Sequence, residues 1–277
     1  MTLFLVSTPI GNLEDITHRA LRVLSEVDII AAEDTRTVKK LLSHYGIAAR
    51  RIVSLFEGNE AARTPALLED LRAGRSVAVV SEAGTPAVSD PGQRLVTEAG
   101  AIGVRVEAIP GPSAVLAALV SSGLATRAFS FFGFPPRQAG ARRKQFGSLR
   151  AHEPTLVFFE SPERLVQTLD DLAEALGPDR EAAVGRELTK LYEETRRGSL
   201  ASLRDHYRDA GVRGECTLVV AGAPPEQQDA AIDLEAAVRE LLDQGLGPKD
   251  VAARLMARTG KPRRTLYQLA LSLSRER

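Results

Sequence analysis

Short apolar runs alternate with amphipathic segments through the first hundred residues, and this alternation constrains the fold more than any other feature of the chain. The amphipathic segments carry apolar residues at helical spacing, as at Val38, Leu41 and Leu42. A strand-helix-strand-helix order predicts a mostly parallel sheet covered by helices on both faces. The predicted strands are residues 3–6, 28–32, 52–56, 77–80 and 104–109.

A second α/β pattern follows the first. Strands are predicted at 155–159, 182–186 and 216–222. The polar segment 223–231, with two adjacent prolines, is typical of a linker. Three short helical patterns come after it, and they predict either a helix-turn-helix or a helical cap. We therefore expect an α/β protein with two α/β domains and a small C-terminal helical domain, with boundaries at 1–112, 113–224 and 225–277.

Composition excludes several classes of protein. The chain has one cysteine, Cys216, and four histidines without metal-ligand spacing, so neither a disulfide framework nor a metal site is expected. A single thiol fits a reducing cytoplasm. No apolar run approaches the roughly 18 residues of a membrane span.

Charge is balanced overall but unevenly distributed. The chain has 36 basic and 36 acidic residues, yet residues 127–150 contain six basic residues and no acid. Residues 247–277 contain eight basic residues against Asp250 and Glu276. Two basic segments on a neutral chain favour contact with a polyanion, and the alternative is that they are solvated loops and a frayed tail.

Four unusual loops follow predicted strands of the first domain. They are TPIGNLEDIT (8–17), AAEDTR (31–36), SEAGTPAVSDPG (81–92) and IPGPSA (109–114). In an open parallel sheet ligands bind at the carboxyl ends of the strands, so these loops predict one site at one edge. In the third loop, Ser89 or Asp90 is expected to cap the following helix.

The ligand of this site is not expected to carry phosphate groups. The chain has neither a G-x-G-x-x-G sequence after a strand nor a G-x-x-x-x-G-K-[ST] loop. Small side chains and few positive charges fit S-adenosyl-L-methionine better, since it has no phosphate and its sulfonium is a cation.

Eight segments in order resemble the S-adenosylmethionine-dependent methyltransferases of the tetrapyrrole-methylase fold. Within that family they are most similar to the branch that acts on ribosomal RNA, because Gly84-Thr85-Pro86 replaces the Gly-Asp-Pro of tetrapyrrole-acting relatives. The segment 55–60 lacks the histidines that the RNA branch often has there. The resemblance is dense over residues 3–222 and looser in the tail. The segments are TPIGNLEDIT, AAEDTRTVKKLL, SEAGTPAVSDPG, PGPSAV, GFPPR, FFESPERL, GRELTKLYEE and GECTLVVAG.

The resemblance implies a methyl donor in the cleft between the two α/β domains. Glu160 would close over it, and Ala221 or Gly222 would line its adenine end. The full set of implied contacts is Pro9, Ile10, Ala83, Gly84, Thr85, Val88, Ser113, Ala114, Glu160, Ala221 and Gly222.

The resemblance also implies an activity, which is methylation of the ribose 2′-hydroxyl of a decoding-centre cytidine in 16S ribosomal RNA of the small subunit, by a homodimer. Such a reaction needs a general base or a cation that stabilises the alkoxide. Structural alternatives are a local Asp34–Arg36 salt bridge and a capping role for Glu187. The candidates for catalysis are Glu33, Asp34, Arg36, Glu187 and Lys190.

Phosphate contacts are expected from a basic loop over 137–144, predicted to be mobile, and from the tail. Two other functions stay open at this point: a tetrapyrrole (precorrin or uroporphyrinogen) C-methyltransferase of the same fold, and a ribosome-assembly factor without catalysis. The candidate RNA contacts are Arg137, Arg142, Arg143, Lys144, Arg254, Arg258, Lys261, Arg263 and Arg264.

Overall fold

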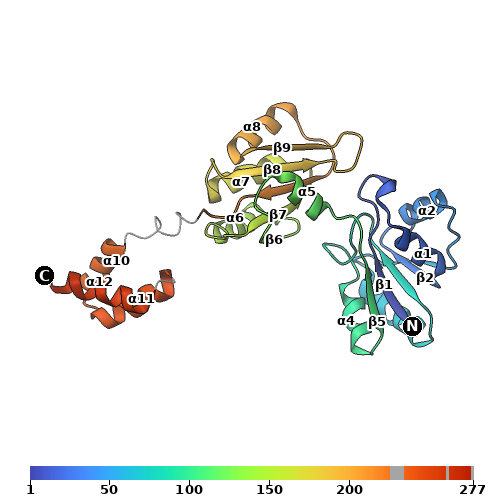
Figure 1. The fold of residues 1–277 in the computed structure, drawn as a ribbon, viewed down its shortest axis with the longest axis horizontal. Coiled ribbons are helices and arrows are strands. Elements are labelled where there is room, and N and C mark those ends of the chain that lie inside the picture. The colour runs from blue at the N-terminus through green and yellow to red at the C-terminus, as the bar shows by residue number, and fades with distance from the viewer. Residues whose placement is uncertain (225–233, 260–261, 276–277) are drawn as a thin grey trace. The chain divides into compact units, whose positions relative to one another are not determined.

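The computed structural model describes residues 1–224, 234–259 and 262–275. The chain forms two compact units, one of residues 1–150 with 154–221 and one of residues 151–153 with 222–277, and each is described by itself (Figure 1). Most of the expected linker, Lys261 and the side chain of Arg258 lie outside the described residues. The three domain boundaries stay predictions.

The first lobe of the larger unit is built on a five-stranded sheet in which every pair is parallel, as the sequence predicts. The order is β3-β2-β4-β1-β5. All residues of β2 and β4 are buried, which is typical of a parallel sheet covered on both faces. The strands are β1 (Thr2–Val6), β2 (Ile29–Ala32), β3 (Ile52–Ser54), β4 (Val77–Val80) and β5 (Arg105–Ile109).

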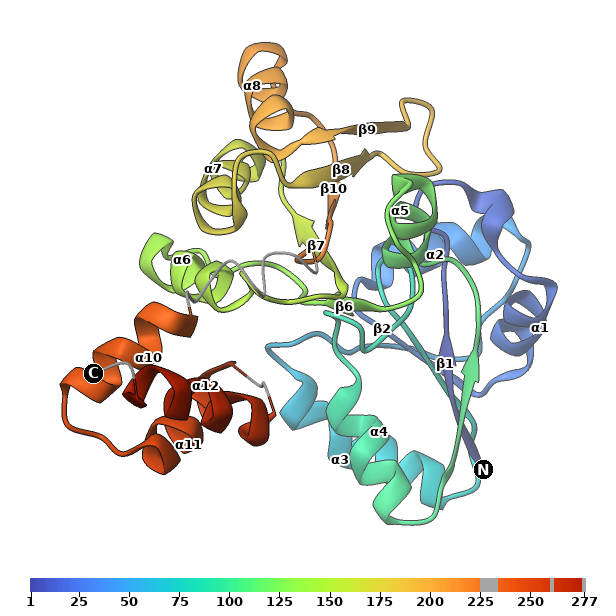
Figure 2. The ribbon, with the colours of Figure 1, turned by 60° about the vertical axis from the view of Figure 1, so that its left-hand side comes forward.

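Helices cover both faces of this sheet (Figure 2). On one face α1 (His18–Glu26) and α2 (Thr35–His44) bury residues against β1, β2 and β4. On the other face α3 (Glu60–Arg72) and α4 (Gln93–Ala101) do the same. A short 3-10 helix, Leu13–Asp15, precedes α1.

The second lobe has a mixed sheet in the order β6-β7-β10-β8-β9. Only β6 and β7 pair in parallel. One helix, α5, packs on one face of the sheet, and α6, α7 and α8 pack on the other. The elements are α5 (Ala114–Ser122), β6 (Phe129–Phe131), α6 (Ala139–Ser148), β7 (Thr155–Glu160), α7 (Leu165–Leu176), β8 (Glu181–Arg186), β9 (Glu194–Ser199), α8 (Leu200–Ala210) and β10 (Cys216–Val220).

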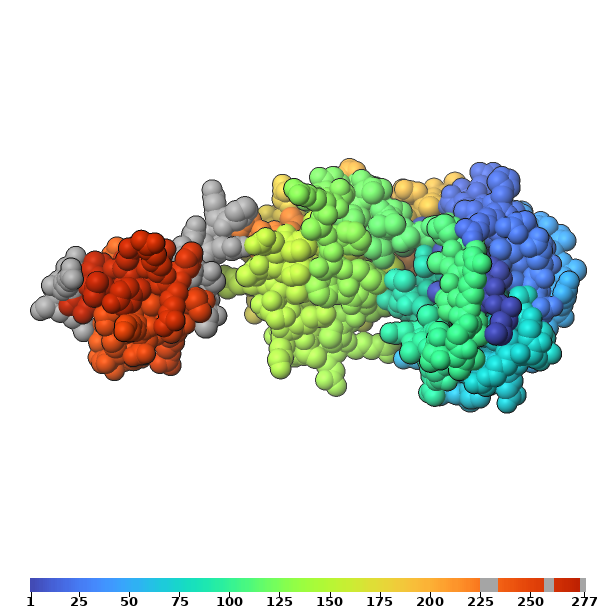
Figure 3. Space-filling view, turned by 60° about the horizontal axis from the view of Figure 1, so that its bottom comes forward, coloured from blue at the N-terminus to red at the C-terminus, as the bar shows by residue number. Residues whose placement is uncertain are grey.

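The elements of this lobe without a counterpart among the predicted elements include β9 and α8. The sequence of β9 is ETRRGS, and none of its residues is buried. It is an edge strand that pairs only with β8, so it needs no apolar run. Figure 3 shows the chain in space-filling form, in which the larger unit runs from blue through green and yellow to orange and the smaller unit is mainly red.

The basic segment 137–144 is not a loop for most of its length, because α6 begins at Ala139. Arg142 is only 1% exposed, and its Nη2 lies 2.6 Å from Oδ2 of Asp171 on α7. Its guanidinium also donates to the carbonyl oxygens of Pro136 and Arg137. A buried arginine must be paired, and Asp171 is the partner. The prediction that Arg142 contacts RNA is therefore wrong.

The described residues of the smaller unit form three helices: α10 (Leu234–Asp243), α11 (Pro248–Thr259) and α12 (Arg263–Arg275). They enclose their own apolar core around Val238, Val251 and Leu266. Arg263 and Arg264 are exposed at the start of α12. None of the helices described in either unit is both long and apolar enough to cross a membrane.

Candidate functional site

The site lies where β1 and β4 end side by side. The chain leaves β1 toward α1 on one face of the sheet and leaves β4 toward α4 on the other, which is the arrangement that opens a crevice in α/β folds. Thr8 and Gly84 join the two loops through a pair of backbone hydrogen bonds of 2.9 and 3.0 Å. This bridge fixes the loop 81–92 beside the first loop.

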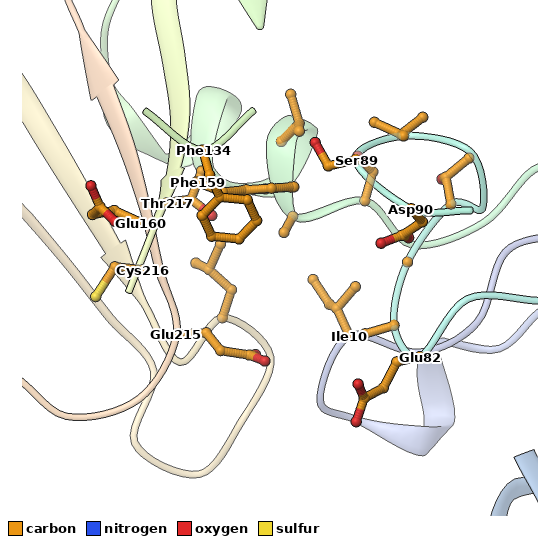
Figure 4. A pocket seen from close by; sticks show the side chains of 18 of the residues that line it. Ile10, Glu82, Ser89, Asp90, Phe134, Phe159, Glu160, Glu215, Cys216 and Thr217 are labelled. Atoms are coloured by element: carbon orange, nitrogen blue, oxygen red, sulfur yellow. The ribbon is translucent and has the colours of Figure 1, made fainter. Parts of the chain in front are cut away.

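A cavity of about 410 Å³ opens at this point and is lined by residues of both lobes (Figure 4). Its volume is in the range of small-molecule sites. The lining contains no lysine, arginine or histidine. It consists of Ile10, Glu33, Glu82, Ala83, Gly84, Thr85, Val88, Ser89, Asp90, Ser113, Ala114, Val115, Phe134, Phe159, Glu160, Ser161, Pro162, Leu188, Glu215, Cys216 and Thr217.

Eight of the eleven residues expected to contact the donor line this cavity, and their binding role stays a prediction. Three residues do not line it. Pro9 lines a smaller neighbouring cavity, and the amide of Ala221 donates to the carbonyl oxygen of Glu181. Gly222 belongs to the other compact unit. The eight are Ile10, Ala83, Gly84, Thr85, Val88, Ser113, Ala114 and Glu160.

The loop 81–92 holds two non-glycine residues in left-handed backbone conformations, Ala87 at φ 66° and Ser89 at φ 63°. Each such residue costs on the order of 1–3 kcal/mol, and such strain clusters at functional sites. Neither Ser89 nor Asp90 caps the next helix, contrary to the sequence-based expectation. The carboxylate of Glu60 accepts from the amides of Gly92 and Arg94 at the start of α4 instead. The two expected caps line the cavity.

Asp90 is an acidic residue of this loop whose pKa is raised by its surroundings. Burial, together with the negative charge of Glu33 and Glu82, raises the pKa of Asp90 to about 6, although a hydrogen bond with Ser81 opposes the shift. Figure 4 shows the Asp90 carboxylate directed into the cavity from the loop of the first lobe. Glu33 accepts a hydrogen bond from the amide of Glu82 at 3.1 Å, so the two loops are joined beside Asp90.

The opposite wall comes from the second lobe and is largely apolar. Phe134 and Phe159 lie with ring centroids 5.5 Å apart, and Leu188 packs in the same cluster as Ile10 of the first lobe. Burial raises the pKa of the Cys216 thiol to about 12, so this thiol stays protonated and does not act as a nucleophile.

Glu160 lines the cavity, but its carboxylate is bound within its own lobe. It accepts hydrogen bonds from the amide of Ser161 and the hydroxyl of Thr168, and it pairs with Arg164 at 3.3 Å. The residue before α7 is Arg164, and its side chain makes no capping hydrogen bond. The helix begins at Leu165.

The amino end of α5 brings partial positive charge to the cavity wall, in contrast to the carboxylates of the first lobe. Ser113 caps this helix by accepting from the amide of Leu116, and Ala114 and Val115 follow it in the cavity wall. The amino end of a helix carries partial positive charge and favours an anionic group. The cavity therefore has carboxylates on one side and, at the amino end of α5, a partial positive charge that favours an anionic group.

The catalytic candidates of the EDTR motif, residues 33–36, do not all line the cavity. Glu33 lines the cavity, whereas Asp34 and Arg36 do not. Asp34 caps α2 and pairs with Arg36 at 2.7 Å. The hydrogen bond from the Arg36 side chain holds the pKa of Asp34 at about 2. The local salt bridge considered as the structural alternative is the arrangement present.

The RELTK motif forms a second ion-pair group beside the cavity, and Leu188 and Glu215 line the cavity whereas Glu187 and Lys190 do not. Lys190 Nζ lies 2.9 Å from Glu187 and 2.8 Å from Glu215. Burial alone would lower the pKa of Lys190, but hydrogen bonds to the two carboxylates outweigh it and raise the pKa. The hydrogen bond with Lys190 lowers the pKa of Glu187. Lys190 is therefore held as a cation, and its role in catalysis stays a prediction.

The same motif joins the two lobes. The amide of Asn12 donates to the hydroxyl of Thr189 at 3.0 Å. A Cβ at Gly11 would lie 2.4 Å from Cγ of Lys190, so only glycine permits this approach. Glu187 and Thr189 have φ values of 51° and 65°, and this turn is the counterpart of the strained turn in the loop 81–92.

Several cavity residues were missed from sequence. Phe134 is 57% exposed, and no site role was predicted for it, although it lies in the GFPPR segment of the family resemblance. Glu215 and Thr217 flank Cys216 at the start of β10, where only an apolar strand was predicted. In the part of the chain that the structure describes, no three His, Cys, Asp or Glu side chains come together as a metal site.

Comparison with known families covers almost the whole chain. Residues 2–204 match the model for Tetrapyrrole (Corrin/Porphyrin) Methylases. Residues 228–274 match the model for the RsmI C-terminal HTH domain. Among solved structures, diphthine synthase superposes with a TM-score of 0.61 at 19% identity, over 80% of this chain and 90% of that one. The uroporphyrin-III-C-methyltransferase from Thermus thermophilus gives 0.57 at 23% identity, over 79% and 94%. These two likenesses concern the fold.

Curated relatives are much more similar in sequence. The ribosomal RNA small subunit methyltransferase I of Mesorhizobium japonicum is 47% identical, over 98% of this chain and 92% of its own length. The protein of that name from Synechocystis is 45% identical over 98% of both chains. That of Mycobacterium bovis is 46% identical over 99% and 96%. The chain therefore belongs to the tetrapyrrole methylase family and, within it, to the family of ribosomal RNA small subunit methyltransferase I.

Proposed function

We propose that this protein transfers a methyl group from S-adenosylmethionine to the ribose 2′-hydroxyl of a cytidine in small-subunit ribosomal RNA. The observation that carries the proposal is the cavity between the lobes, which is lined by carboxylates and small side chains without a basic residue. Relatives at 42–47% identity are named for the methylation of small-subunit ribosomal RNA. The tetrapyrrole alternative rests on neighbours at 23% identity or less, so it shares only the fold.

The lining fits the charge pattern of the donor. S-adenosylmethionine, when bound, supplies a methyl group on a positively charged sulfur. Glu33, Glu82 and Asp90 offer negative charge on one side of the cavity, and the amino end of α5 suits the donor's carboxylate. Phe134 and Phe159 offer aromatic faces for an adenine.

Asp90 is the residue best placed to accept the proton of the ribose hydroxyl. A base works best when its pKa is near the working pH, and a carboxylate with a pKa of about 6 is largely ionised at neutral pH while still holding a proton more strongly than an ordinary aspartate. Its carboxylate would take the proton as the hydroxyl oxygen bonds to the methyl carbon and the carbon–sulfur bond breaks toward sulfur. Glu33 would act beside it by keeping the Glu82 amide in place.

RNA would approach through exposed basic side chains. Arg137 and Lys144 remain exposed on the second lobe, while Arg143 is half-exposed and paired with Asp171 at 3.0 Å. Arg263 and Arg264 are exposed in the smaller unit. We propose these side chains as phosphate contacts, which makes RNA binding strongly dependent on salt.

We also propose a homodimer in the cytoplasm. On α5, Leu116 and Val120 are 51% and 71% exposed and lie four residues apart on one helix face, while the opposite face packs on the sheet. A second copy of the chain would bury this face across a two-fold axis. Val120→Glu would then shift sedimentation from dimer to monomer, whereas a monomeric wild-type protein would refute this part.

The function is tested with labelled S-adenosylmethionine and 30S subunits from cells that lack the endogenous enzyme. The label should appear on the ribose of one decoding-centre cytidine. Label on a base would contradict the proposed chemistry. If the protein binds S-adenosylmethionine and 30S subunits but transfers no label, the assembly-factor alternative replaces it.

A further inference from the structure

A second cavity of about 180 Å³ lies beside the first and is not explained by the methyl donor. Glu82 lines both cavities. The wall between them contains the Thr8–Gly84 bridge, since Thr8 lines the smaller cavity and Gly84 the larger. The smaller cavity is lined by Thr8, Pro9, Leu13, Thr37, Val38, Lys40, Leu41, Ser81 and Glu82.

The lining of this cavity is mainly apolar, with one cation, Lys40, and one carboxylate, Glu82. Pro9, Leu13, Val38 and Leu41 supply carbon surface, and Leu13 is 39% exposed although it is a large apolar residue. Lys40 is the basic residue of the lining. An apolar slot with a cation at its edge suits a planar base attached to a phosphate, because unpaired RNA bases are bound by burying their faces while lysines hold the backbone.

Helix α2 extends this positive charge along its exposed side. Arg36, Lys39 and Lys40 are all exposed, and they lie three and four residues apart on one face. Arg36 pairs with Asp34, but no ion pair is present for Lys39 or Lys40 among the described residues. After its cap the helix contains no acid. Like charges at this spacing destabilise a helix slightly, and a bound polyanion would offset that cost.

We propose that the smaller cavity is a subsite for the RNA nucleotide next to the methylated one, and that Lys40 and Lys39 hold the adjoining phosphate. This inference rests on the proposed function, since the larger cavity must hold the donor and the reacting ribose. The shared Glu82 keeps the two cavities adjacent, so neighbouring nucleotides of one strand could occupy them together. The protein would then recognise its target by binding the neighbouring nucleotide in the smaller cavity as well as the methylated nucleotide in the larger one.

The phosphate contact is tested by Lys40→Glu, with Arg63→Glu as the matched control. Arg63 is also exposed and lies on α3, which packs on the opposite face of the same sheet. Lys40→Glu should raise KM for 30S subunits about tenfold at moderate salt and lower the slope of log affinity against log salt by about 1. The rate at saturating 30S and the affinity for S-adenosylmethionine should not change. Arg63→Glu should match the wild type.

The base-binding slot is tested by Leu13→Trp, which fills the cavity from its exposed edge. The probes are 30S subunits reconstituted with 16S RNA that is intact or carries an abasic site at either neighbour of the target cytidine. For the wild-type protein, an abasic site at one of the two neighbours should weaken the binding of 30S subunits. For Leu13→Trp, the same abasic site should cause no further loss of affinity, because both changes remove the same contact.

The outcomes separate this inference from the proposed function. If the wild type labels 30S subunits and Lys40→Glu behaves as Arg63→Glu does, the phosphate contact is refuted while the function stands. Additive effects of Leu13→Trp and the abasic site would refute the slot. If the wild type transfers no methyl group to 30S subunits, both proposals fall together.

Discussion

The loops after β2 and β4 contain the same kinds of residue and serve different purposes. In the first, Asp34 has a side chain that is 23% exposed, caps α2 and pairs with Arg36, which holds the pKa of Asp34 at about 2. In the second, Asp90 is half-buried beside Glu33 and Glu82, with a pKa of about 6. Both aspartates follow neighbouring parallel strands. The difference shows that a nearby cation makes a carboxylate a structural group, whereas burial among acids makes it a proton acceptor.

The backbone explains why the two loops differ. The loop after β2 turns at once into a helix, so its aspartate takes the capping position. In the loop after β4 the capping role passes to Glu60 of another helix, and left-handed residues at 87 and 89 direct Ser89 and Asp90 into the cavity. The strained backbone conformations are therefore in the second loop, and the packing of the surrounding lobe must stabilise them.

The largest effect is expected from Asp90→Asn. Removing the proton acceptor should lower the single-turnover methylation rate by about 100-fold or more, because general-base catalysis contributes factors of this size. The asparagine keeps the shape of the side chain, so calorimetry should still detect the binding of S-adenosylmethionine. Asp34→Asn is the matched control and should methylate at close to the wild-type rate. Equal methylation rates for Asp90→Asn and Asp34→Asn would contradict the different roles that we assign to the two loops.

A smaller effect is expected from Ala83→Trp in the same loop. The indole would project into the larger cavity, and the overpacking should weaken S-adenosylmethionine binding by about 10- to 100-fold. Calorimetry measures this directly. The exposed position of Ala83 should leave the fold intact, as an unchanged circular dichroism spectrum would show. Unaltered affinity would place the donor elsewhere.

The smallest effect is expected from Asp34→Ala. This change removes the cap of α2 and the pair with Arg36, so the melting temperature should fall slightly while S-adenosylmethionine binding persists. Asp34→Asn retains a capping side chain and should melt closer to the wild type. Loss of donor binding in Asp34→Ala would mean that this loop contributes to the site more than its geometry indicates.

Sequence patterns predicted the fold well where apolar periodicity was strong. All five strands of the first lobe and the three C-terminal helices were predicted, because buried strands and amphipathic helices leave clear patterns. The edge strand β9 was missed because pairing on one side requires no apolar run. Eight of the eleven donor contacts that the family resemblance implied line the cavity, and their binding role stays a prediction.

Side-chain roles were harder to predict than positions. Nothing in the local sequence distinguishes Arg142 from Lys144, and only the distant Asp171 decides that the first is buried. Likewise Glu60, 30 residues before Asp90 in the chain, bonds the amides at the start of α4, so that Asp90 is not needed as the cap. Such roles depend on pairs that meet only in the folded chain.

The pH dependence of the single-turnover rate tests the role of Asp90 most directly. The raised pKa means that Asp90 holds its proton below about pH 6 and loses it above, so the base is available only on the alkaline side. The wild-type rate should fall as the pH drops through about 6, and Asp90→Asn should lose this inflection together with most of its rate. An inflection near 6 that persists in Asp90→Asn would contradict the account.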